Sequence, residues 1–245
     1  MESLLTLPVG DYLLVETVMK VTASLAAMMA MLLALSAIAF PITLRLPLMV
    51  GAVTLAGAAW FEFGVWQSWR EAFELAGTSY CVSGHPLDEE GGVIAWSLGV
   101  PGLLLALGMA RTSGKHPGHR YMGQLSAALI ALALLSLVSA KTSLLILLYA
   151  GYLLCFKIPR QNNGFNEGRV TLGLWAFSAI VLGSFIRILG TSHLLPLGHE
   201  AATTLSRGEI IRSLSDLLCL LAPAMALLMK ASNQVQKEVD PSYSK

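Results

Sequence analysis

The sequence predicts an all-α integral membrane protein, a single bundle of seven transmembrane helices. Composition is the first observation behind this fold class. Hydrophobic residues make up 55% of the 245-residue chain and charged residues 13%, which is too apolar for an ordinary soluble domain. The mean hydropathy of +0.67 agrees with this. In addition, the apolar residues gather in seven spans, most of them near the ~20 residues that cross about 30 Å of hydrocarbon.

The seven spans follow one another with turn-forming residues between them. They cover roughly residues 13–40, 46–69, 93–110, 122–140, 143–158, 170–190 and 210–230, of which the fifth is the shortest. The separators are Pro41, the loop 83–92, the run 113–118, the hydrophilic stretch RQNNGFNEGR and residues 190–198. Residues 1–232 are therefore expected to form one seven-helix domain, and the polar residues 233–245 a short cytoplasmic tail.

The distribution of Lys and Arg predicts the orientation of the bundle. These residues collect in alternate connections and in the C-terminus: Arg45, Arg111, Lys115, Arg120, Lys157, Arg160, Arg169, Lys230, Lys237 and Lys245. No Lys or Arg precedes Lys20, and one of the other connections is the acidic loop EAFELAGTSYCVSGHPLDEEGG. We therefore expect the N-terminus outside and the C-terminus in the cytoplasm, with the protein in the inner membrane. Trp60, Trp66 and Trp69 fit an exposed aromatic belt at the membrane interface.

No catalytic motif is present in the sequence. A nucleophile elbow, a P-loop and a dinucleotide fingerprint are all missing, so no enzyme class is indicated. The five histidines fall in predicted loops, and His116 with His119 lacks the further ligands of a metal motif. We therefore expect neither an enzyme nor a metal site, and no nucleic-acid partner.

The third span carries a motif that resembles a known family. Residues 91–104 are GGVIAWSLGVPGLL, similar to the third-helix pattern Arg-Tyr-x-Asp-Trp-x-x-Thr-x-Pro-Leu-Leu of the microbial (type I) rhodopsins, with the frame set by Trp96 and Pro101. MMAMLLALSAIAF in the first span, AAWFEFGVWQSW in the second and SDLLCLLAPAMALL in the seventh also resemble segments of that family. The resemblance implies a rhodopsin-like fold and covers most of the membrane part.

The same resemblance implies that the photochemical groups of the family are missing. Ala95 stands at the position of the proton-accepting Asp, Ala106 at that of the proton donor and Gly92 at that of the Arg. Asp216 matches the seventh-helix counter-ion, but Leu220 fills the position of the retinal-bearing lysine. A retinal Schiff base requires an amine deep in the bundle. We therefore expect no covalent retinal and no light-driven pumping.

Charged residues inside the spans are candidates for function because burying them in a membrane is costly. Asp216 is expected to pair with Arg187 of the sixth span, since the family's arginine position holds Gly92, and the expected role of the pair is structural. Glu62 is a possible buried acid. It is interpreted either as a proton or cation site, or as a side chain that faces a wet interface or a neighbouring subunit.

Three classes of function remain open. The first is a structural or assembly subunit, an oligomer with itself or with another membrane protein such as a photosynthetic pigment complex or another rhodopsin. The second is a non-covalent binder of retinal, carotenoid or lipid, with Gly99, Gly102 and Ala106 leaving room on the third helix. The third is a light-independent ion or proton transporter using Glu62 and Asp216, against which the apolar third helix argues.

Overall fold

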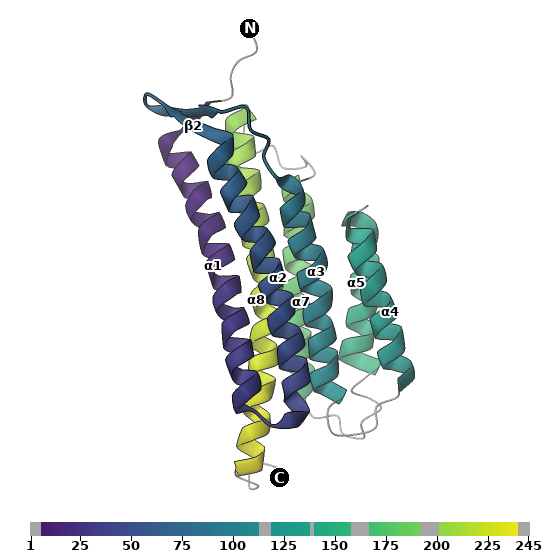
Figure 1. The fold of residues 1–245 in the computed structure, drawn as a ribbon. Helices are drawn as coiled ribbons and strands as arrows, with labels where there is room; N and C mark the ends of the chain where they lie inside the picture. The colour runs from purple at the N-terminus through teal and green to yellow at the C-terminus, as the bar shows by residue number, and fades with distance from the viewer. Residues whose placement is uncertain (1–5, 113–118, 138–139, 158–166, 192–200, 240–245) are drawn as a thin grey trace.

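Seven long helices lie side by side in the computed structural model, which describes residues 6–112, 119–137, 140–157, 167–191 and 201–239 (Figure 1). The helices are α1 (Val9–Ala39), α2 (Ile42–Ala72), α3 (Glu89–Thr112), α4 (His119–Ser136), α5 (Ala140–Tyr152), α7 (Glu167–Thr191) and α8 (Ala201–Val239). A π-helical turn, η1 (Leu153–Lys157), extends α5. Each predicted span corresponds to one helix, so the predicted seven-helix all-α bundle is confirmed.

Four of the described helices, α1, α2, α3 and α8, are long and apolar enough to cross a membrane. The apolar parts of the other three helices are shorter: Met122–Ser136, Ser143–Cys155 and Gly173–Ile188. α8 lies next to α1, α2, α3 and α7, whereas α4 packs against α3 and α5, and α5 packs against α7. The start of α1 and the end of α8 lie at opposite ends of the bundle (Figure 1).

The helix ends differ from the predicted span ends where polar residues continue a helix. α8 begins at Ala201, before the predicted start at 210, and runs to Val239, past the predicted domain boundary at 232. Residues 240–245 of the predicted tail lie outside the described residues. At the other end of the chain, α1 and α2 are separated at Pro41, which cannot donate a backbone hydrogen bond and so precedes the first turn of α2.

A small antiparallel sheet covers one end of the bundle, in a region expected to be a loop. Its strands are β1 (Thr6–Pro8), β2 (Phe73–Ala76) and β3 (Ser79–Val82), in the order β1-β3-β2. β2 and β3 form a hairpin whose turn begins at Gly77 with φ +66°, a conformation that suits glycine. We call this side of the bundle the sheet end (Figure 1).

Aromatic side chains join the sheet to the helices. The Tyr12 ring stacks on the Tyr80 ring with centroids 3.7 Å apart, and the ring centroids of Trp69 and Phe73 are 4.7 Å apart. Trp69 is completely buried, so its predicted place in an exposed interfacial belt is wrong, because the sheet covers it. Trp60 is 77% exposed.

Candidate functional site

The middle of α3 contains the motif that suggested the family resemblance. Trp96 and Pro101 are buried there, and Ala95 and Ala106 have no exposed surface. Gly99 lies between them on the same helix. This stretch therefore presents only apolar surface at the two positions where the resemblance places the proton acceptor and donor.

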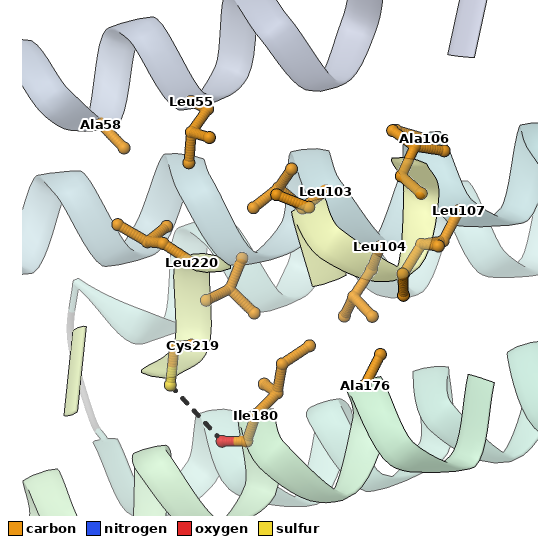
Figure 2. Close-up of a cluster of buried hydrophobic side chains, with 14 of the residues drawn as sticks. Leu55, Ala58, Leu103, Leu104, Ala106, Leu107, Ala176, Ile180, Cys219 and Leu220 are labelled. Carbon is orange, nitrogen blue, oxygen red and sulfur yellow. Dashed lines mark hydrogen bonds between the residues drawn. The ribbon is translucent and has the colours of Figure 1, made fainter. Parts of the chain in front are cut away.

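Leu220 of α8 fills the space beside Gly99. Its side chain is 1% exposed, and a methyl group added at Gly99 would overlap Leu220 Cδ2 and lie 3.2 Å from Ala58 Cβ. At Gly102, an added methyl would lie 2.9 Å from Thr54 Cβ. Side chains from α2 and α8 thus occupy the room expected at both glycines (Figure 2).

The α7 side of this core is also closed. Ile180 and Ala176 are fully buried, and they face Leu104 of α3 (Figure 2). Cys219 Sγ donates to the Ile180 carbonyl at 3.5 Å, which helps to satisfy a backbone acceptor where no water is available. These residues supply no amine, and their side chains pack together in one buried apolar core.

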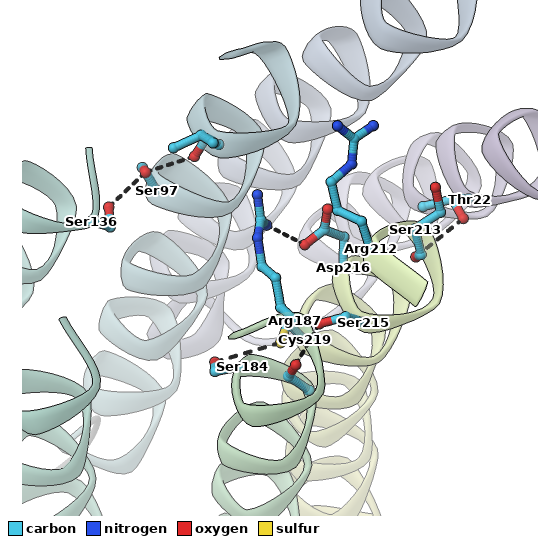
Figure 3. Close-up of polar contacts among 12 residues, drawn as sticks. Thr22, Ser97, Ser136, Ser184, Arg187, Arg212, Ser213, Ser215, Asp216 and Cys219 are labelled. Atoms are coloured by element: carbon cyan, nitrogen blue, oxygen red, sulfur yellow. Dashed lines mark hydrogen bonds and ion pairs between the residues drawn. The ribbon is translucent and has the colours of Figure 1, made fainter. Parts of the chain in front are cut away.

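A buried charge cluster lies on the sheet-end side of this apolar core. It consists of Glu62, Arg187, Glu209, Arg212 and Asp216 (Figure 3 shows its arginines and Asp216). The Arg187 guanidinium donates to Asp216 Oδ1, so the two residues expected to pair are in contact. On α8, Arg212 Nη2 lies 2.7 Å from Glu209 Oε2. Residues 209, 212 and 216 share one face of the helix because of their spacing.

Arg212 occupies the place that Gly92 leaves open. A methyl group added at Gly92 would lie 3.2 Å from Arg212 Cζ and 3.3 Å from Arg212 Nε. The guanidinium of α8 therefore reaches the α3 position where the resemblance places an arginine. Arg212 was not among the residues predicted to form a site, although it lies within the predicted span 210–230. The spacing of Arg212 and Asp216, four residues apart in one helix, was the signal that could have found it.

Glu62 approaches this cluster from α2. Its side chain is 1% exposed, so the interpretation that it faces a wet interface or a neighbouring subunit is wrong. Its carboxyl group lies within hydrogen-bonding reach of the Asp216 carboxyl. If both groups are ionised, Glu62 Oε1 and Asp216 Oδ2 have no hydrogen-bond donor among the residues that the structure describes.

At the other end of the bundle, Arg111 turns into the protein. Its Nη1 donates to the Leu154 carbonyl at 2.6 Å, and its side chain packs on Gly173. Leu154 belongs to the π-helical turn η1. Arg111, which was counted as a charge of a cytoplasmic connection, is therefore a contact between α3 and the end of α5. His116 lies outside the described residues, as does the predicted run that contains it.

Comparison with known proteins finds similarity in structure. No protein-family model and no curated protein sequence matches the chain. The structure of thermophilic rhodopsin matches with a TM-score of 0.80 at 20% identity, covering 96% of this chain and 99% of that chain. Xanthorhodopsin, a light-driven ion pump with dual chromophore, matches with a TM-score of 0.80 at 19% identity over 96% of this chain and 99% of that chain.

A third match has a lower TM-score. Blue light-absorbing proteorhodopsin from Med12 matches with a TM-score of 0.59 at 13% identity, over 91% of this chain and 98% of that chain. The chain therefore has the seven-helix fold of these rhodopsins over nearly its whole length.

Proposed function

We propose that this chain is a divergent, lysine-less member of the microbial rhodopsin family that neither binds retinal covalently nor pumps ions. In this proposal it acts as a structural or assembly subunit in the inner membrane. The observation that carries the proposal is Leu220, which lies at the family's lysine position in a closed apolar core.

The chain's own lysines offer no substitute for the missing amine. Lys20 is exposed on α1 and lies over the Trp66 ring, 5.9 Å from its centroid. Lys141 belongs to the first turn of α5, and Lys230 lies toward the far end of α8. Lys20 and Lys141 belong to α1 and α5, and Lys230 lies ten residues beyond Leu220 on α8, so none of them stands where the resemblance places the lysine.

Proton pumping also needs ionisable groups along the whole path through the bundle. Here the path would have to pass Ala95 and Ala106 on α3, and Leu220, Ala224 and Leu227 on α8, all of them buried and apolar. This argues against a pump and against the alternative of a light-independent transporter that uses Glu62 and Asp216.

The closed core also argues against a non-covalent ligand in the position of retinal. A ligand there would have to displace Leu220 from Gly99 and Thr54 from Gly102, and both displacements would disturb contacts between α3 and its neighbours. The proposal therefore assigns function to the outer surface of the bundle, where another membrane protein or a second copy would bind. Xanthorhodopsin, with its dual chromophore, is the type of pigment protein with which such a subunit could assemble.

The test is to purify the full chain from its native membrane under mild conditions, record its visible spectrum and determine what is bound to it. We expect a colourless chain in fixed stoichiometry with itself or with another membrane protein. After all-trans-retinal is added and borohydride reduces the sample, no retinal should remain covalently attached. A stable retinal adduct that is lost in Lys20→Arg, Lys141→Arg or Lys230→Arg would overturn the proposal and identify the amine. A colourless monomer without a partner would overturn the assembly role alone.

A further inference from the structure

The buried charge cluster has more acids than bases. Glu62, Glu209 and Asp216 would contribute three negative charges if all were ionised, and Arg187 and Arg212 contribute two positive charges. Among the residues that the structure describes, one negative charge would then have no compensating positive charge inside the bundle. Buried charges without a partner are strongly unfavourable. Binding of one proton would make the cluster neutral.

The geometry identifies the pair that would hold this proton. A carboxylate can only accept hydrogen bonds, whereas a neutral carboxylic acid can also donate one. The Glu62 and Asp216 carboxyl groups are within hydrogen-bonding reach of each other. With both ionised, Glu62 Oε1 and Asp216 Oδ2 lack a donor among the described residues. A single proton between the two groups supplies that donor and removes the repulsion between like charges.

The ion pairs leave Glu62 and Asp216 as the pair that shares the proton. Glu209 has Arg212 at 2.7 Å, and Arg187 donates to Asp216. The charged groups that interact electrostatically with the Glu62 carboxyl are Asp216, Arg212 and Arg187. The same two arginines interact electrostatically with the Asp216 carboxyl.

The other elements packed around the pair present neutral groups. From α3, Gly92 packs against the Arg212 side chain. From α1, the Thr22 hydroxyl donates to the Ser213 carbonyl at 3.4 Å. One turn of α8 beyond Asp216 lies the thiol of Cys219, which donates to the Ile180 carbonyl. No charge from these elements compensates the extra acid among the residues that the structure describes.

Access to the pair is possible from one end of the bundle. Toward the sheet end, Arg212 and Glu209 occupy the preceding turns of α8, and Arg207 is exposed beyond them. Toward the other end, Leu220 and the apolar core close the path. The described groups on the first side are therefore charged, whereas those that close the second side are mainly apolar.

We propose that Glu62 and Asp216 bind one exchangeable proton between them, at a site that is open to the sheet end and closed to the opposite end. The proton comes from water, forms an O–H bond on one carboxyl and is hydrogen-bonded to the other, and it leaves by the same route. The site binds and releases a proton but does not transfer it across the membrane.

Infrared spectroscopy of the full chain in lipid nanodiscs tests the proposal. We expect the C=O stretching band of a buried neutral carboxylic acid near neutral pH, shifted to lower frequency in D2O. The band should be lost in Glu62→Gln and also in Asp216→Asn, because each substitution removes one member of the pair. Glu74→Gln changes an exposed acid of β2 and should leave the band unchanged.

The variants should fold, because Gln and Asn keep the shape of the side chains and their amides can donate in place of the proton. Far-UV circular dichroism verifies this, and Glu62→Asp, which should shift the band in frequency, replaces any variant that does not fold. Absence of the band from the wild-type chain, or its persistence in both Glu62→Gln and Asp216→Asn, overturns the shared proton. In oriented proteoliposomes the band should respond to pH at the sheet end. A response to pH at the opposite end overturns the one-sided access.

Discussion

Gly99→Ala should destabilise the bundle, and Leu220→Ala should relieve much of the damage when the two substitutions are combined. The added methyl group at Gly99 would overlap Leu220 Cδ2 and lie 3.2 Å from Ala58 Cβ. Shortening Leu220 to alanine removes the overlapping atoms. Opposite effects are expected at Gly57 of α2, where nothing lies within 4 Å of an added methyl group. Gly57→Ala is therefore the matched control.

The expected magnitudes follow from packing and helix propensity. Overfilling a packed core costs about 1–3 kcal/mol, whereas replacing Gly by Ala within a helix gains about 1 kcal/mol. Gly99→Ala should thus destabilise by up to about 2 kcal/mol, and Gly57→Ala should stabilise. Leu220→Ala alone should cost about 2–5 kcal/mol because Leu220 is buried and leaves a cavity. The double variant should be more stable than the sum of the single effects by about 0.5–3 kcal/mol.

The measurement is the free energy of unfolding in mixed micelles titrated with sodium dodecyl sulfate, followed by far-UV circular dichroism. The three substitutions and the Gly99→Ala/Leu220→Ala double variant are compared with the wild-type chain. Two results together would refute the overlap between an added methyl group at Gly99 and Leu220. The effects of Gly99→Ala and Leu220→Ala would be additive, and Gly99→Ala would be as stable as Gly57→Ala. That result would mean that the space beside Gly99 is open and could receive a ligand.

Three further predictions can be measured in the same titration. Arg187→Gln should lower the free energy of unfolding by about 3–5 kcal/mol, because it leaves the buried Asp216 carboxylate without its ion-pair partner. Adding Asp216→Asn should restore part of the loss, and no recovery in the double variant would contradict the pairing. Trp69→Ala should lower the free energy of unfolding by about 3–5 kcal/mol because the ring is fully buried under the sheet. Trp60→Ala, at a 77% exposed position, should change it by no more than about 0.5 kcal/mol. Equal effects would argue against the burial of Trp69. Gly77→Val should destabilise by about 1–2 kcal/mol, because φ is +66° at that turn, and a neutral effect would show that the hairpin turn tolerates another conformation.

The sequence alone determined the fold class. Seven apolar spans are visible in the sequence because hydropathy depends only on the residues within each span. Trp96 and Pro101 set the frame of the third helix, and the resemblance predicts that Leu220 stands in the lysine position. The absence of an amine there follows from residue identity, which needs no coordinates. Residues 201–209 of α8 were missed because polar residues can continue a helix beyond its apolar part.

The tertiary structure decided which charged and aromatic residues meet. Glu62 and Asp216 belong to helices that are far apart in the sequence. Only the rotation of α2 and α8 about their axes brings the two carboxyl groups together. Arg212 reaches Gly92 for the same reason. Trp69 is buried because β1 pairs with β3, although the whole of α1 and α2 lies between these strands in the sequence. Hydropathy is a local property of the chain, whereas these contacts depend on how helices rotate and pack, so they become visible only in three dimensions.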